Sequence, residues 1–148
     1  MVSEQTIWSL LKRIPDPEIP VISIVDLGVV RKVKFYDTES YIEITPTYSG
    51  CPALQMMQDE IEKTLEKKGI SKYKINTVLR PAWTTDWMSI EAKKKLKKFG
   101  IAPPEKNIIC PQCNSRDVEV ISQFGSTACK ALYKCNACLE PFDYFKCI

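Results

Sequence analysis

The sequence contains no histidine among its 148 residues. Histidine is the side chain that most often serves as a general base, and as a nitrogen ligand for metals, near neutral pH. Catalytic machinery of the Ser-His-Asp or Cys-His type is therefore excluded. Any metal site must be built from the seven cysteines and the carboxylates.

Long hydrophobic runs are also missing. No stretch approaches the roughly 20 apolar residues that span a bilayer, and the first residues lack the basic and apolar regions of a secretory signal peptide. We therefore expect a cytoplasmic protein that has no membrane partner. The formal net charge is only +3, which is too small to indicate nucleic-acid binding by itself.

The spacing of apolar residues and the positions of proline and glycine predict helices over 3–13, 52–68 and 86–99. Strands are predicted over 29–36, 41–45 and 73–79. This order indicates an α+β domain over residues 1–105, in which helices cover one face of a small mixed sheet. The segment Ala102-Pro103-Pro104 is expected to be a linker.

Residues 106–148 are predicted to be a separate module that contains six of the seven cysteines. A segment of ~40 residues usually needs a metal or a disulfide to fold. Two C-x2-C pairs, with the spacing of a zinc ribbon, are formed by Cys110, Cys113, Cys135 and Cys138. We expect a closed, structural four-cysteine zinc site, with an iron or iron-sulfur site and disulfides as the alternatives.

Cys129 and Cys147 lie outside these pairs. Cys129 is interpreted as a buried small side chain and Cys147 as a terminal thiol. The alternative is that both are accessory thiols that handle metal or sulfur transiently.

Cys51 is the remaining cysteine, and it directly precedes the helix predicted over 52–68. At the N-cap of a helix, free amides and the helix dipole favour the anionic thiolate. The alternative is that Cys51 caps the helix and packs inward. Asp16, Glu18 and Asp26 are candidates to face the same loop, although acids in proline-rich turns usually cap or solvate the turn.

Five lysines lie between residues 93 and 98. We interpret them first as a solvated helix face, second as a docking surface for an acidic protein, and third as a nucleic-acid contact. Trp83 and Trp87 are expected to serve in packing rather than in base stacking.

Several motifs, taken together and in order, resemble the PaaD (PaaJ) family of phenylacetate-degradation proteins over essentially the whole chain. They are Asp16-Pro17-Glu18-Ile19-Pro20, Asp26-Leu27-Gly28, residues 45–52, residues 81–87, residues 124–130 and residues 140–147. The first domain alone resembles the wider family of iron-sulfur assembly factors that includes SufT. Asn114 departs from the glycine expected after the first cysteine pair, but asparagine tolerates the left-handed conformation.

The resemblance implies an iron-sulfur-assembly domain and a zinc ribbon that act with the phenylacetyl-CoA epoxygenase system. It implies maturation of metal centres through a reactive Cys51 supported by Asp16, Glu18 and Asp26, with transient iron or an iron-sulfur cluster at that site. The implied partners are epoxygenase components or other iron-sulfur clients, and a homodimer stays open. The alternative is a stable, non-catalytic subunit of the oxygenase complex. In both cases no catalytic residue is assigned.

Overall fold

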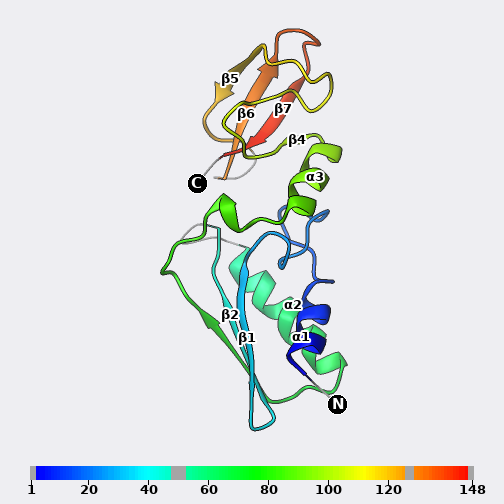
Figure 1. Ribbon diagram of the computed structural model, residues 1–148, viewed down its shortest axis with the longest axis vertical. Coiled ribbons are helices and arrows are strands. Elements are labelled where there is room, and N and C mark those ends of the chain that lie inside the picture. The colour runs from blue at the N-terminus through cyan, green and yellow to red at the C-terminus, as the bar shows by residue number, and fades with distance from the viewer. Residues whose placement is uncertain (1–2, 48–52, 126–128, 147–148) are drawn as a thin grey trace. The chain divides into compact units, whose positions relative to one another are not determined.

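The computed structural model describes residues 3–47, 53–125 and 129–146. The chain divides into two compact units, Met1–Trp83 and Thr84–Ile148, and each unit has its own sheet (Figure 1). In the described part of the chain, no helix is both long enough and apolar enough to cross a bilayer.

The first unit contains helices α1 (Glu4–Leu11) and α2 (Leu54–Lys67) and strands β1 (Val30–Tyr36), β2 (Glu39–Ile44) and β3 (Tyr73–Thr77). Its sheet has the order β1-β2-β3, in which β1 and β2 pair antiparallel while β2 and β3 pair parallel. Parallel neighbours require a crossover, and α2 supplies it. The predicted α+β class with a mixed sheet is confirmed.

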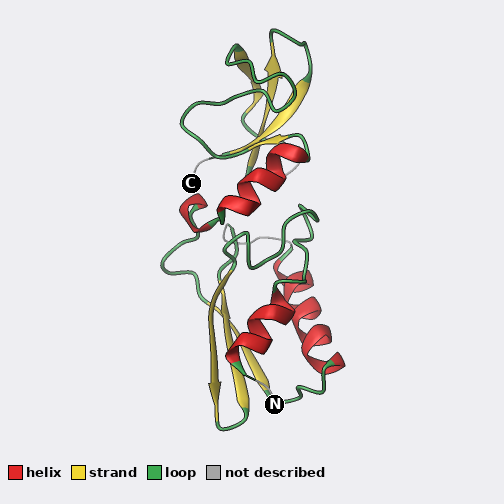
Figure 2. Ribbon diagram, turned by 45° about the vertical axis from the view of Figure 1, so that its right-hand side comes forward, coloured by secondary structure: helices red, strands yellow, loops and turns green. Residues whose placement is uncertain are grey.

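The core of the first unit lies between the sheet and the two helices, which share one side of it (Figure 2). Strand β2 alternates inward and outward positions, and its inward residues Ser40, Ile42 and Ile44 are fully buried. Helix α2 buries Met57, Ile61 and Leu65 at a spacing of four residues, which places them on one stripe of the helix.

The second unit contains a short 3-10 helix η1 (Thr85–Trp87), helix α3 (Ile90–Lys98) and strands β4 (Ile101–Ala102), β5 (Val118–Ser122), β6 (Lys130–Cys135) and β7 (Pro141–Phe145). The strand order is β4-β7-β6-β5. Its core cluster is formed by Ala102, Cys110, Ala131, Cys135, Phe142 and Tyr144.

The helix predicted over 86–99 is divided into η1 and α3. The reason is a second N-cap, because the Ser89 hydroxyl accepts a hydrogen bond from the Ala92 N–H at 3.0 Å. Met88, between the two helices, has an extended backbone with φ −71° and ψ 139°. The polypeptide therefore begins α3 four residues later than predicted.

The predicted linker at 102–104 begins inside a strand. Ile101 and Ala102 pair in parallel with Asp143 and Tyr144 of β7, about forty residues further along the chain. As a result α3 and β4 belong to the second compact unit, whereas the sequence had placed residues up to 105 with the first domain. That residues 106–148 form a separate module, with a boundary after residue 105, stays a prediction.

Candidate functional site

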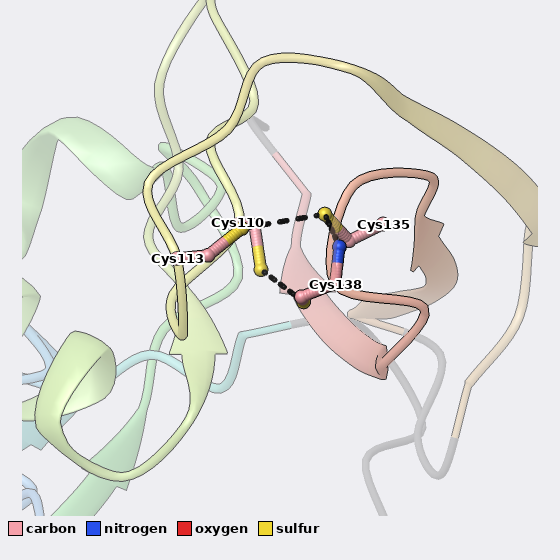
Figure 3. A group of neighbouring side chains, drawn as sticks. All are labelled: Cys110, Cys113, Cys135 and Cys138. Atoms are coloured by element: carbon pink, nitrogen blue, oxygen red, sulfur yellow. Dashed lines mark hydrogen bonds between the residues drawn. The ribbon is translucent and has the colours of Figure 1, made fainter.

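Four cysteine sulfurs converge in the second unit (Figure 3). The Sγ atoms of Cys110, Cys113, Cys135 and Cys138 all lie within 4.8 Å of one another. The sulfurs of Cys110 and Cys138 are 3.7 Å apart, and those of Cys113 and Cys135 are 3.5 Å apart. The two predicted C-x2-C pairs are therefore brought together as one cluster.

The spacing of these sulfurs fits a tetrahedral zinc ion. Zinc-sulfur bonds of about 2.3 Å place the sulfurs of a regular tetrahedron about 3.8 Å apart, close to the 3.7 Å and 3.5 Å separations. A disulfide would require about 2.05 Å. The donor set is four soft thiols with no position left for a substrate, so a bound zinc would stabilise the fold of the ribbon.

Both cysteine turns are built in the same way. The backbone N–H of Gln112 donates to Cys110 Sγ at 3.4 Å, and the backbone N–H of Cys138 donates to Cys135 Sγ at 3.5 Å. Each turn is closed by a residue four positions after its first cysteine, Asn114 with φ 62° and Leu139 with φ 66°. Asn114 thus adopts the left-handed conformation expected for that position.

The pKa values of Cys135 and Cys138 are shifted in opposite directions. The backbone N–H of Cys138 is the main reason why the pKa of Cys135 is lowered to about 6. The backbone N–H of Glu140 lowers the pKa of Cys138, but burial and the neighbouring thiols outweigh it and raise that pKa to about 12. A divalent cation removes this conflict because it favours every thiolate at once.

Asp16 is buried and serves the turn in which it lies. Its Oδ2 atom accepts hydrogen bonds from the backbone N–H groups of Glu18 at 2.9 Å and Ile19 at 2.8 Å. One carboxylate oxygen therefore caps the Asp-Pro-Glu turn. Capping is the role that the sequence analysis named as usual for acids in such turns. Glu18 is half-buried beside it.

Asp26 is buried in a second turn, at the entry to β1. Its backbone N–H donates to the Ser23 hydroxyl at 3.1 Å, and Gly28 closes the turn with φ 88°. The indole N–H of Trp83 donates to the backbone oxygen of Leu27 at 3.0 Å, and both groups are buried. Trp83 thus fixes the Asp26 turn from 56 residues away, a role that the sequence analysis did not assign.

The Asp26 turn lies next to the segment that leads into residues 48–52. The backbone N–H of Thr45 donates to the Val29 oxygen at 2.8 Å, and Thr45 and Thr47 are both buried. Sequence reasoning missed these two threonines as buried polar groups. Both threonines lie in the motif that precedes Cys51, and this position was the one indication in the sequence of a role near the site.

Two of the candidate thiols, Cys51 and Cys147, lie outside the described residues. Helix α2 has Ala53 as its N-cap, so the prediction that Cys51 is the N-cap is corrected. The first turn of α2 holds no acid, and Ala53 offers no side-chain cap. Cys129 is buried, with 3% of its surface exposed, and is not among the four clustered cysteines.

Two family models match this chain. The model described as "Iron-sulfur cluster assembly protein" matches residues 4–74, and the model described as "PaaD zinc beta ribbon domain" matches residues 95–146. The second match includes all four clustered cysteines.

Known proteins match nearly the whole chain or somewhat less than two thirds of it. An Escherichia coli (strain K12) protein, named as a putative subunit of 1,2-phenylacetyl-CoA epoxidase, is 48% identical over 96% of this chain and 92% of that protein. The Bacillus subtilis (strain 168) "Fe-S protein maturation auxiliary factor YitW" is 35% identical, over 61% of this chain and 89% of that protein. A crystal structure of a "Domain of Unknown Function DUF59" from Bacillus anthracis matches with a TM-score of 0.59 and 29% identity, over 63% of this chain and 90% of that one.

Proposed function

Since this chain belongs to the PaaD family, we propose that it matures the iron-sulfur or metal centres of a phenylacetyl-CoA epoxygenase system. The observation that carries the proposal is the pairing of an iron-sulfur-assembly match over 4–74 with a ribbon match over 95–146. Relatives that match 53–64% of this chain are named as maturation auxiliary factors. The first unit is therefore the part to which we assign the transfer chemistry.

The ribbon has a structural task in this proposal. Zinc held by Cys110, Cys113, Cys135 and Cys138 supplies folding energy. Its closed four-sulfur shell offers no open position for cargo, so the iron or cluster that is passed to the client needs another ligand.

We assign that task to Cys51, supported by Asp16, Glu18 and Asp26. The hydrogen bond between Thr45 and Val29 supports this grouping, because it holds the Asp26 turn next to the segment that leads to residue 51. The uncapped start of α2 supports a thiolate nearby, since the free amides of a helix N-terminus favour negative charge. Such a thiol needs a reducing compartment, which we take to be the cytoplasm.

Metal analysis of anaerobically purified protein tests the division of labour. We expect zinc in both the wild type and Cys51→Ser, and additional iron or acid-labile sulfide only in the wild type. Equal iron and sulfide in the two proteins would refute a cargo site at Cys51.

Client maturation is the functional test. In cells that contain only Cys51→Ser, the cluster content of the iron-sulfur reductase component should fall at least about fivefold, because sparse soft ligation at one thiolate is what allows transfer. Cys129→Ala is the matched control, since it removes a buried cysteine that is not among the four clustered ones and should leave client clusters intact. Normal client clusters with Cys51→Ser would contradict the proposal.

A stable, non-catalytic oxygenase subunit is the second candidate, and the name of the Escherichia coli relative favours it. Fixed stoichiometry with active epoxygenase through purification would support this candidate. An oxygenase that stays fully active after maturation, once this protein has been removed, would exclude it.

A further inference from the structure

A depression of about 440 Å³ lies in the second unit between α3 and the first cysteine turn. It is lined by Lys94, Lys97 and Lys98 on the helix and by Pro111 and Gln112 on the turn. The two walls approach closely, because a Cβ atom at Gly100 would lie 3.6 Å from the side-chain nitrogen of Gln112. The lysines therefore stand beside the first cysteine turn rather than on an isolated helix.

The charge of the molecule is concentrated on this helix. The first unit carries eleven basic and eleven acidic residues, whereas the second carries ten basic and seven acidic residues, so the whole net charge of +3 belongs to the second unit. Lys94, Lys97 and Lys98 are exposed, and none forms an ion pair with a described carboxylate. Three unneutralised ammonium groups thus line one hollow.

The neighbouring surface limits how far this positive charge extends. A smaller cavity of about 60 Å³ shares Lys97 but also carries Glu105, which offsets the charge on that side. Four thiolates around one divalent cation add about −2 nearby. The electrostatic field of the second unit as a whole is therefore weak. An anion is attracted only when it lies within a few ångströms of the lysines, inside the hollow.

We propose that this hollow is a docking site for an acidic, extended segment of a partner protein. The inference rests on the proposed function for the identity of that partner, a client that presents two or three neighbouring Asp or Glu side chains. Local charge of this kind mainly improves association rate and orientation, and suits a transient encounter.

The same observations disfavour other anions. A nucleic acid needs a basic surface that continues along its backbone, whereas this one ends at Glu105. A small phosphorylated ligand is usually held by a buried polar group, and the three lysines of this hollow are all exposed. Exposed lysine ammonium groups stay hydrated and mobile, and they can pair with the carboxylates of an extended segment, which are hydrated and mobile too.

Binding of hexaglutamate to the zinc-loaded full chain tests the proposal by NMR. At low ionic strength the peptide should cause saturable amide shifts in the second half of α3 and at Gln112. The variant K94Q/K97Q/K98Q should lose about tenfold in affinity. The matched control K63Q/K67Q/K68Q removes three exposed lysines from the region of α2 and its C-terminal end, and should change affinity by less than about twofold.

Equal loss in the two triple variants, or shifts spread over lysines of both units, would overturn the site. Tighter binding of an oligothymidylate or of inorganic pyrophosphate than of hexaglutamate, through the same residues, would overturn the choice of partner. Zinc content is measured in every variant, so that an unfolded ribbon is not mistaken for a lost contact.

The outcome is separable from that of the proposed function. Cys51→Ser should bind hexaglutamate like the wild type even though client clusters are lost. If client clusters form normally with Cys51→Ser while hexaglutamate still binds the hollow, the docking site stands and the maturation role falls.

Discussion

Leu139 occupies a left-handed backbone position, with φ 66°, in the second cysteine turn. A side chain with a Cβ atom pays roughly 1–2 kcal/mol for this conformation, which glycine avoids. The leucine side chain is 68% exposed and so gains little from burial. The equivalent position in the first turn holds Asn114, which adopts the conformation more readily.

We therefore expect Leu139→Gly to stabilise the zinc-loaded protein by about 1 kcal/mol. Asn114→Ala, the matched change in the other turn, should destabilise it by a similar amount. Urea unfolding with bound zinc measures both. Equal destabilisation by the two changes would show that Leu139 makes contacts that outweigh its backbone strain.

At the residue scale, the candidate site was predictable only where its residues lie close together in the sequence. Cys110 and Cys113, three residues apart, indicate a metal turn by themselves, and the second pair repeats the spacing. The capping role of Asp16 follows from its own turn. The bond from Trp83 to Leu27 could not be predicted, because it joins two motifs 56 residues apart that have no common periodicity.

At the scale of elements, α2 and β3 are joined by a side-chain hydrogen bond. The Tyr73 hydroxyl donates to Glu66 Oε1 at 2.9 Å. This bond is the main reason why the pKa of Tyr73 is raised from 10.0 to about 12, followed by burial and the charges of Glu62 and Glu66. The folded state therefore favours the protonated phenol.

The stabilising effect of this contact should be complete below pH 10, the unfolded pKa, and should disappear as the pH rises through about 12. Absorbance titrations of the phenol groups should be recorded for the wild type and for Tyr73→Phe. The difference between the two curves should give the raised pKa of Tyr73. In Glu66→Gln the pKa of Tyr73 should move back toward 10.0. An unchanged pKa in that variant would contradict the assigned cause.

Most elements were predictable because their information is short-range. The stripe of Met57, Ile61 and Leu65 identifies α2, and the alternation in β2 identifies a half-buried strand. The strands predicted over 29–36 and 41–45 leave four residues between them, but the observed turn uses two, because Asp37 and Thr38 both adopt positive φ without a glycine to indicate it. Ser89 marks the start of α3, but only if its capping role is recognised.

At the scale of the whole molecule, strand β4 joins the sheet of the second unit. Ile101 and Ala102 are buried at 5% and 1% exposure and pair with β7. No local pattern in two residues predicts such a pairing, which explains why the sequence analysis assigned them to the first domain. Removal of β4 exposes its partner edge on β7.

We expect a fragment of residues 84–148 to bind zinc more tightly than a fragment of residues 106–148. Loss of the buried Ile101 alone removes about 2 kcal/mol of folding energy, and metal affinity is linked to folding. Competition with a chromophoric chelator measures the difference, which should exceed about tenfold. Equal affinities would instead place the independent folding boundary after residue 105, as the sequence predicted.

The position of β7 between β4 and β6 has a consequence for synthesis on the ribosome. The sheet cannot be completed until residues 141–145 have left the exit tunnel, although β4 and the first cysteine pair emerge much earlier. During that interval the nascent chain carries Cys110 and Cys113 as an open two-thiol chelate. Two thiols alone hold a metal loosely, so the ion that stays bound is the one present when Cys135 and Cys138 complete the four-sulfur shell.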